Sequence, residues 1–385
     1  MTLEFIGYAA GRQTSETIAP DGPTIQPHYL REIARTHEQA GFDRVLIAQS
    51  ASSPDGFVLA DQVLAATERL GVLLAHRPGF VAPTQLARKF ATLDAFHPGR
   101  VALHVITGGD DADQARDGDF TDKPTRYRRT DDFLSVVRRT WESAEPFDHD
   151  GEFYRVRGAL SDVRPERPIP VYFGGASTDA IRVGGKHADV YAFWGEPLAG
   201  IAERIDQVRA AAAGRDVAFS VSLRPIPAAT EAEAWERARD VLRLTQDRVG
   251  EFKGRRDSTE AVGSRRLLEA AATGDVVDER LWTAVAKTTG AAGNSTALVG
   301  SYEQVADSLL DYVRLGVGTL LIRGFSPLAD ARDYGTLVRL VRERADATDP
   351  AKGRPTPARH ATVATKSFGR DCGRMGNDQH STVGA

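Results

Sequence analysis

Residues 72–106 read VLLAHRPGFVAPTQLARKFATLDAFHPGRVALHVI, and this stretch decides the fold. It begins with an apolar run at Val72–His76 and ends with another at Val101–Ile106. Between the two runs, Thr84–Phe96 has the apolar spacing of an amphipathic helix. A strand, a helix and a second strand in this order form a βαβ unit, whose strands are parallel. The stretch therefore predicts a parallel sheet covered by helices.

The same alternation of short apolar runs and longer amphipathic stretches extends in both directions from this unit. The other expected strands are Leu3–Tyr8, Arg44–Ala48, Val171–Phe173, Asp189–Phe193, Phe219–Arg224 and Thr319–Ile322, which makes eight in all. The other expected helices are Tyr29–Gln39, Val58–Thr67, Arg126–Ser143, Asp179–His187, Leu198–Ala213, Glu231–Leu244, Tyr302–Leu315 and Leu328–Ala345. Eight strands that are each followed by a helix predict a (β/α)8 TIM barrel, an α/β fold of about 250 residues.

The chain has 385 residues, more than such a barrel needs, and three segments account for the surplus. Phe147–Val156 alternates around an Asp-Gly pair, which predicts a β-hairpin. Gln246–Ser295 is polar and contains several glycines, and we expect it to form a lid over the barrel. We place the barrel domain in residues 1–350. Apolar periodicity ends after it, so we expect a disordered basic tail over residues 351–385.

The composition excludes several classes of protein. Lys and Arg number 49 against 53 Asp and Glu, a net charge of −4, so no broad basic surface is expected for nucleic acid. The single cysteine, Cys372, excludes an intramolecular disulfide, and the absence of an HExxH pair argues against catalytic zinc. No apolar run approaches the ~20 residues of a membrane helix, and the first residues do not resemble a signal peptide. We therefore expect a soluble cytoplasmic protein.

In TIM barrels the chemistry lies at the carboxyl ends of the strands. In this chain the residues at those ends are aromatic and cationic, and include Tyr8, His104, Trp194, Arg224 and Arg323. Such a set suits an anionic, planar ligand better than a metal ion or a glycoside, for which paired carboxylates are needed. For His104 the pattern favours a hydrogen-bonded core histidine. For Trp194 and Arg224 it leaves packing and function equally open.

One strand end carries a candidate phosphate site. Gly174-Gly175-Ala176-Ser177-Thr178 joins an expected strand directly to an expected helix. Free backbone N–H groups, a hydroxyl group and the helix dipole can converge on a phosphate at such a junction. The same residues are also compatible with an ordinary turn in which Ser177 or Thr178 caps the helix. The residues alone predict a barrel with a planar ligand that carries a phosphate.

Several collinear motifs, none of them specific alone, together resemble those of the bacterial luciferase-like flavin-dependent monooxygenases. The motifs lie in residues 74–79, 99–110, 126–127, 171–177, 194–197 and 296–300. The resemblance runs from about Leu3 to Ala345, and within this superfamily it is strongest to the alkanesulfonate monooxygenases. It implies a TIM barrel, in agreement with the alternation described above.

The resemblance also implies a reaction. Enzymes of this kind use reduced FMN and O2 to oxygenate a small organic substrate, and the alkanesulfonate enzymes release an aldehyde and sulfite. A separate NAD(P)H-dependent flavin reductase supplies the reduced FMN. Related barrels usually form dimers or tetramers, so a homo-oligomer is implied. The cofactor carries the difficult chemistry, while the protein orients it and excludes water.

Site residues are carried over from the resemblance position by position. Tyr127 and Ser177 match the residues that hold the flavin phosphate, and His104 stands where the family has Asn or His beside the flavin ring. The full set is His104, Tyr127, Ala176, Ser177 and Thr178 for the cofactor, Arg224 and Trp194 for catalysis, and Ser52, Ser222, Arg323 and Phe325 for the substrate. No metal ligand is implied.

The sequence makes a more specific prediction for Arg224. It shares one strand face with Ser220 and Ser222, so we expect it to point into the barrel mouth and bind an anionic group of the substrate. A buried guanidinium needs a counter-charge, and we expect Glu196 or the substrate to supply it.

Two other functions are compatible with the same barrel. One is a deazaflavin (F420)-dependent oxidoreductase, which transfers hydride and uses no oxygen. The other is a flavin-binding barrel without catalysis. It is suggested by substrate positions that differ from those of the alkanesulfonate monooxygenases, since Ser52 stands where they have a cysteine and Phe325 where they have a tyrosine.

Overall fold

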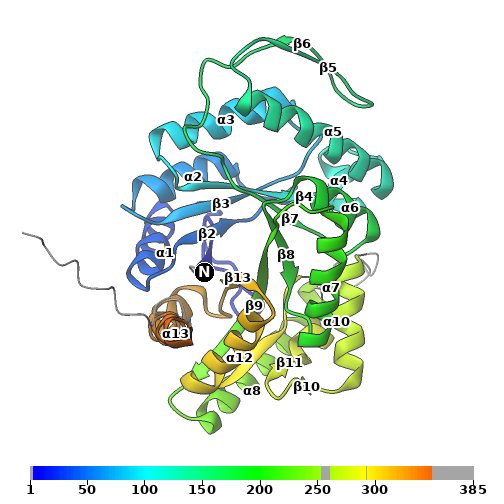
Figure 1. Ribbon diagram of the computed structural model, residues 1–385. Helices are drawn as coiled ribbons and strands as arrows, with labels where there is room; N and C mark the ends of the chain where they lie inside the picture. Colours follow the sequence, from blue (N-terminus) through cyan, green and yellow to red (C-terminus); the bar gives the residue numbers. More distant parts are fainter. Residues whose placement is uncertain (1–2, 253–260, 292, 349–385) are drawn as a thin grey trace, which may run out of the picture.

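The computed structural model describes residues 3–252, 261–291 and 293–348. Its centre is a closed barrel of parallel strands surrounded by helices (Figure 1). The barrel strands are β1 (Glu4–Ala9), β2 (Arg44–Ile47), β3 (Gly71–His76), β4 (Val101–Ile106), β7 (Val171–Gly174), β8 (Val190–Trp194), β9 (Ala218–Ala228) and β13 (Val317–Ile322). Each strand pairs with the next in this order, and β13 pairs with β1 to close the ring. The predicted TIM barrel is confirmed.

The expected helices are all present, with ends within three residues of the predicted ones. They are α1 (Pro27–Gln39), α2 (Gly56–Ala65), α3 (Pro83–Phe96), α5 (Lys123–Glu142), α6 (Thr178–His187), α7 (Leu198–Ala211), α8 (Glu231–Asp247), α12 (Tyr302–Arg314) and α13 (Pro327–Thr348). Asp55, Ser177 and Ser301 cap α2, α6 and α12 with their side chains, as short polar residues do. Gly41 and Gly316, which follow α1 and α12, adopt positive φ values of 84° and 102° that glycine tolerates best.

Apolar side chains fill the protein on both sides of the barrel wall. Alternate residues of each strand point outward and join the helices in the largest core, while the others point inward. The inner cluster contains Ile6, Leu73, Ala102, Tyr172 and Leu321. The interior is therefore packed, and the inward positions near the carboxyl ends are the ones left for a ligand. His104, two residues after Ala102, occupies such a position.

The segment over residues 246–295 contains secondary structure that its polar composition did not predict. It comprises the 3-10 helix η1 (Val249–Phe252), α10 (Val262–Thr273), β10 (Val276–Val277), β11 (Leu281–Trp282) and α11 (Ala284–Thr289). Strand β9 runs on beyond the barrel, and its residues Arg224–Ala228 pair with β12 (Ala297–Ser301), to which β11 and β10 are added. Apolar residues of this extension and α8 form a second core. Closure of the segment over a ligand stays a prediction.

A hairpin and a short helix lie outside the barrel and its expected helices. The predicted hairpin is formed by β5 (Phe147–Asp150) and β6 (Arg155–Ala159), which lie at one edge of the molecule beyond α5 (Figure 1). A short helix, α4 (Asp111–Arg116), follows β4 and was not predicted. The tail predicted for residues 351–385 lies outside the described residues. No helix within the described ranges is long and apolar enough to cross a membrane.

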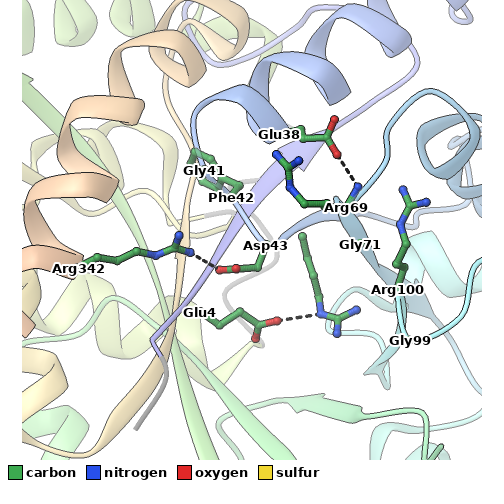
Figure 2. A pocket seen from close by; sticks show the side chains of 11 residues that line it. Glu4, Glu38, Gly41, Phe42, Asp43, Arg69, Gly71, Gly99, Arg100 and Arg342 are labelled. Atoms are coloured by element: carbon green, nitrogen blue, oxygen red, sulfur yellow. Dashed lines mark hydrogen bonds and ion pairs between the residues drawn. The ribbon is translucent and has the colours of Figure 1, made fainter. Parts of the chain in front are cut away.

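At the amino end of the barrel, charged residues line a cavity of about 410 Å³ (Figure 2). Arg44 contacts Glu4 at 2.8 Å, and Arg342 of α13 contacts Asp43 at 2.7 Å. Glu38 of α1 accepts hydrogen bonds from three consecutive backbone N–H groups of the α2–β3 connection. These contacts join α1, α13 and the first strands. Residues at this end of a TIM barrel serve stability, so the chemistry is expected at the opposite end.

Gly184 of α6 gives a direct test of the packing between helix and barrel. A Cβ atom at Gly184 would lie 2.4 Å from the Tyr191 ring of β8, so the ring would have to move. We expect Gly184→Ala to lower the free energy of unfolding in urea by about 1–3 kcal/mol. Gly250→Ala is the control, because a Cβ atom there meets nothing within 4 Å. Equal stabilities of the two variants would contradict the packing described.

Candidate functional site

The turn between β7 and α6 is held in one orientation by residues from β8 and α7. The Gly175 carbonyl oxygen accepts hydrogen bonds from Arg204 Nη2 at 3.0 Å and from the Tyr191 hydroxyl at 3.1 Å. The Ala176 carbonyl oxygen accepts another from Arg204 Nη1 at 3.3 Å. The C=O and N–H groups of a trans peptide point in opposite directions. The N–H groups of Ala176 and Ser177 are therefore directed away from Arg204.

Helix α6 begins directly after this turn. The Ser177 Oγ atom accepts a hydrogen bond from the Ala180 N–H at 3.2 Å, so Ser177 is the helix cap that the sequence allowed. The first N–H groups of a helix have no acceptor within the helix and carry partial positive charge. In the described part of the chain, no backbone or side-chain acceptor is found for the N–H groups of Ala176 and Ser177. The turn therefore presents several donors to an anion.

Tyr127 of α5 completes the turn. Its side chain is 5% exposed, and its hydroxyl oxygen would lie only 3.1 Å from a Cβ atom at Gly175, so glycine leaves the space it needs. Burial raises the pKa of Tyr127, and a hydrogen bond with Ser177 acts in the opposite direction. The residues implied for the flavin phosphate, Tyr127 and Ala176 to Thr178, thus lie together. Their N–H and hydroxyl groups fit the oxygen atoms of a phosphate.

His104 lies on the inward face of β4 and reaches the end of the neighbouring strand. Its Cε1 atom would be 3.3 Å from a Cβ atom at Gly174. Burial lowers the pKa of His104 to about 4, and a hydrogen bond with the backbone of Tyr172 opposes this only partly, so the ring is neutral at pH 7. Nδ1 is buried and has no hydrogen-bond partner among the described residues. His104 is therefore not the fully bonded core histidine that the pattern favoured.

Trp194 lies at the carboxyl end of β8 and is covered by the insertion. A Cβ atom at Gly263 of α10 would lie 3.0 Å from the Trp194 ring. Ala261, just before α10, lies 3.5 Å from the Cβ position of Gly109 in the connection after β4. The start of α10 therefore lies near the carboxyl ends of both β8 and β4.

Arg224 points inward as expected, but its predicted counter-charge was wrong. The side chain is 1% exposed and lies 2.8 Å from the carboxylate of Glu16, in the β1–α1 connection. It also donates a hydrogen bond to the Gly324 carbonyl at 2.9 Å. Glu196 instead contacts Arg266 of α10 at 2.6 Å. The reason is that Glu196 follows the end of β8 and faces α7 and α10 rather than the barrel axis.

Two predicted substrate residues surround this ion pair. Arg323, at the end of β13, contacts the same Glu16 carboxylate at 3.0 Å. Phe325 is buried in the second core, and its ring centroid lies 3.6 Å from the Arg224 guanidinium carbon. The structure therefore places Phe325 behind Arg224, as a surface against which the guanidinium stacks. A substrate contact requires an open position at the barrel mouth, and Phe325 does not occupy one.

The other two predicted substrate residues differ in their exposure. Ser222 points inward on β9, and its Oγ accepts a hydrogen bond from Asn294 Nδ2 at 2.9 Å. Ser52 is exposed in the connection after β2 and contacts the Ser50 hydroxyl. Ser222 is thus part of the barrel mouth, whereas Ser52 lies on its rim.

Three residues that shape this region were missed by sequence reasoning. The sequence contained a signal for Arg204, because this charged residue interrupts the buried apolar stripe of α7, which is formed by Ile201, Ile205 and Val208. A charged residue at such a position needs a buried partner. Glu16 and Asn294 lie in connections without a repeating pattern, so their contacts could not be inferred.

Comparison with known proteins assigns the family. Residues 3–319 match the luciferase-like monooxygenase family. The chain belongs to this family. Its fold is similar to that of riboflavin lyase solved with modified FMN and riboflavin (21% identity, 90% of this chain and 92% of that one, TM-score 0.72). It is also similar to EDTA monooxygenase from Chelativorans sp. BNC1 (18%, 89% and 94%, TM-score 0.70).

Not every similar structure in this fold group is an oxygenase. An F420-dependent secondary alcohol dehydrogenase, solved with an F420-acetone adduct, matches with 19% identity over 89% of this chain and 99% of that one, at a TM-score of 0.64. The luciferase-like family predicted from the sequence is confirmed. At these identities the solved structures establish the shared fold, and the choice of substrate rests on this chain's own residues.

The neutral state of His104 has a measurable consequence for stability. In the unfolded chain its pKa returns to about 6.5, so the unfolded state binds more protons as the pH falls from about 6.5 to about 4. Stability is therefore lost over that range. We expect His104→Asn to reduce the slope of the free energy of unfolding against pH by up to about 1.4 kcal/mol per pH unit. Equal slopes in the wild type and His104→Asn would contradict this account.

Proposed function

We propose that the protein is the oxygenating component of a two-component monooxygenase and receives reduced FMN from a separate NAD(P)H-dependent flavin reductase. The observation that carries this proposal is the β7–α6 turn. There Arg204 orients the backbone N–H groups of Ala176 and Ser177, for which the described part of the chain offers no acceptor, beside the Tyr127 hydroxyl. When bound, reduced FMN supplies the electrons by which one atom of O2 enters the substrate and the other leaves as water.

Each cofactor residue has a role that its surroundings support. The N–H groups of Ala176 and Ser177 and the hydroxyl groups of Ser177 and Tyr127 would hold the phosphate. Arg204 acts from the other side of the turn and fixes the direction of the donors. His104 offers a neutral ring whose Nδ1 has no partner among the described residues and could form a hydrogen bond without adding charge to the site.

Trp194 and α10 supply the walls of the site. The start of α10 lies against Trp194 and near the connection after β4, so in this proposal it limits the access of water to the barrel mouth. Oxygen activation by a reduced flavin depends on this exclusion, because water diverts reactive intermediates. We therefore assign Trp194 to shielding the reacting atoms, in keeping with its predicted catalytic position.

We propose a small uncharged organic molecule as the substrate. An alkanesulfonate, which the sequence resemblance suggested, would need free cationic groups, and Arg224 and Arg323 already share Glu16. Ser222 remains a candidate substrate contact at the mouth and Ser52 one at its rim.

Assembly into a homo-dimer or tetramer is part of the same proposal, because related barrels assemble in this way.

A deazaflavin-dependent hydride transfer is the second candidate. F420 carries a phosphodiester, which the same turn would accept, and one similar structure contains an F420 adduct. The two candidates differ in their need for oxygen.

The test is oxygen consumption by the full chain with reduced FMN, a flavin reductase and a panel of ketones, sulfones, alkanes and sulfonates. We expect consumption coupled to oxidised product from an uncharged compound. Binding and oxidation of reduced F420 without oxygen would support the second candidate. Flavin binding without any coupled product across the panel would support a barrel without catalysis.

Ser177→Ala links this activity to the proposed phosphate site. Loss of one charge-assisted hydrogen bond should weaken the binding of reduced FMN about 10- to 150-fold, equivalent to ~1.5–3 kcal/mol. Ser301→Ala is the matched control, because Ser301 caps α12 by the same kind of hydrogen bond with which Ser177 caps α6. Unchanged affinity in Ser177→Ala, measured by anaerobic titration, would show that the phosphate lies elsewhere.

A further inference from the structure

We propose that Glu16 determines substrate specificity: its carboxylate occupies the anion-binding position of Arg224 and Arg323, so that the barrel mouth accepts uncharged substrates and rejects anionic ones. The inference rests on the proposed function only in taking the barrel mouth as the substrate site. It concerns a residue of the β1–α1 connection for which the sequence motifs assign no role.

The geometry of the three charged groups supports this role. Glu16 reaches both guanidinium groups, at 2.8 Å from Arg224 and 3.0 Å from Arg323. Burial alone would raise the pKa of Glu16, but the two arginines outweigh it and lower the pKa to about 2. Glu16 is therefore ionised throughout the physiological range. An entering sulfonate or carboxylate would have to lie beside this negative charge or displace it.

Displacement is opposed by the way in which Glu16 is anchored. The hydroxyl groups of its neighbours Ser15 and Thr17 both donate hydrogen bonds to the carbonyl oxygen of Phe325. Arg248 donates another to the Ser15 carbonyl at 2.7 Å. The carboxylate is thus tethered at the arginine pair, and a tethered group competes at a high effective concentration with any free anion.

The remaining donors indicate what kind of ligand the site can take. The Nε and Nη1 atoms of Arg224 and the Nε atom of Arg323 are buried and have no hydrogen-bond partner among the described residues. The 2.8 Å contact between Arg224 Nη1 and Glu16 Oε2 is therefore an ion pair and leaves this donor able to accept a further partner. Buried donors of this kind are usually paired in a functional state. A neutral carbonyl, sulfone or hydroxyl oxygen would satisfy them without bringing a second negative charge next to Glu16. The substrate class is therefore an uncharged molecule with an oxygen acceptor.

The test compares two probes of similar shape, 1-butanesulfonate and the uncharged butyl methyl sulfone, by calorimetric titration of the full chain with FMN present and absent. For Glu16→Gln we expect butanesulfonate to bind at least tenfold more tightly than to the wild type, while the sulfone changes less than threefold. Glu16→Asp keeps the charge and should show no comparable gain. The double variant Glu16→Gln/Arg224→Met should lose the gain.

Three results would overturn the inference: tight binding of butanesulfonate by the wild type, no gain in a folded Glu16→Gln, or a gain that persists in the double variant. If Glu16→Gln does not fold, Thr17→Val decides, because it loosens the tether without changing charge. A several-fold gain in butanesulfonate affinity there supports the proposal, and no gain overturns it. Because the readout is probe binding, failure of FMN to bind or to support oxygenation counts against the proposed function alone.

Discussion

The closed barrel imposes one constraint on the rest of the structure. Every second residue of a strand points into the barrel interior, which is narrow enough that these side chains fill it. The inner cluster around Ala102 and Tyr172 fills that space. A ligand can therefore contact only the last inward residues, such as His104, Trp194 and Arg224, and the connections above them. This is why the site depends on parts outside the barrel, namely the β1–α1 connection that carries Glu16 and the start of α10.

The β7–α6 turn, the proposed phosphate site, is held in place by the residues packed behind it. The close approach of α6 to β8 at Gly184 allows the Tyr191 ring to lie where its hydroxyl bonds the Gly175 carbonyl. Arg204, buried on α7, bonds the same carbonyl and the next one. Because these two carbonyl groups are fixed on one side of the turn, the N–H groups of the same peptides are fixed on the other side. These donors need not reorganise when an anion binds. The two arginines around Glu16 are arranged differently, because their buried positive charge is balanced by a carboxylate of the protein itself.

The sequence predicted what local patterns encode. Strand and helix alternation identified the eight barrel strands, and the glycine–serine junction after β7 identified the candidate phosphate site. Strands β10, β11 and β12 were missed. Strands β10 and β11 have two residues each, too few to show a period, and β12 was not among the predicted strands. The pairing of Arg224 with Glu16 was missed as well. It joins segments far apart in the chain, and no local pattern distinguishes Glu16 from Glu196, which follows a predicted strand end and contacts Arg266 of α10 instead.

The central claim is that the β7–α6 turn binds the phosphate of a flavin. The most direct test is the ratio of the affinities of the full chain for FMN and for riboflavin, which differ only in that phosphate, measured with both flavins reduced. We expect FMN to bind at least a hundredfold more tightly, because several charge-assisted hydrogen bonds are lost with riboflavin. Equal affinities would contradict the claim.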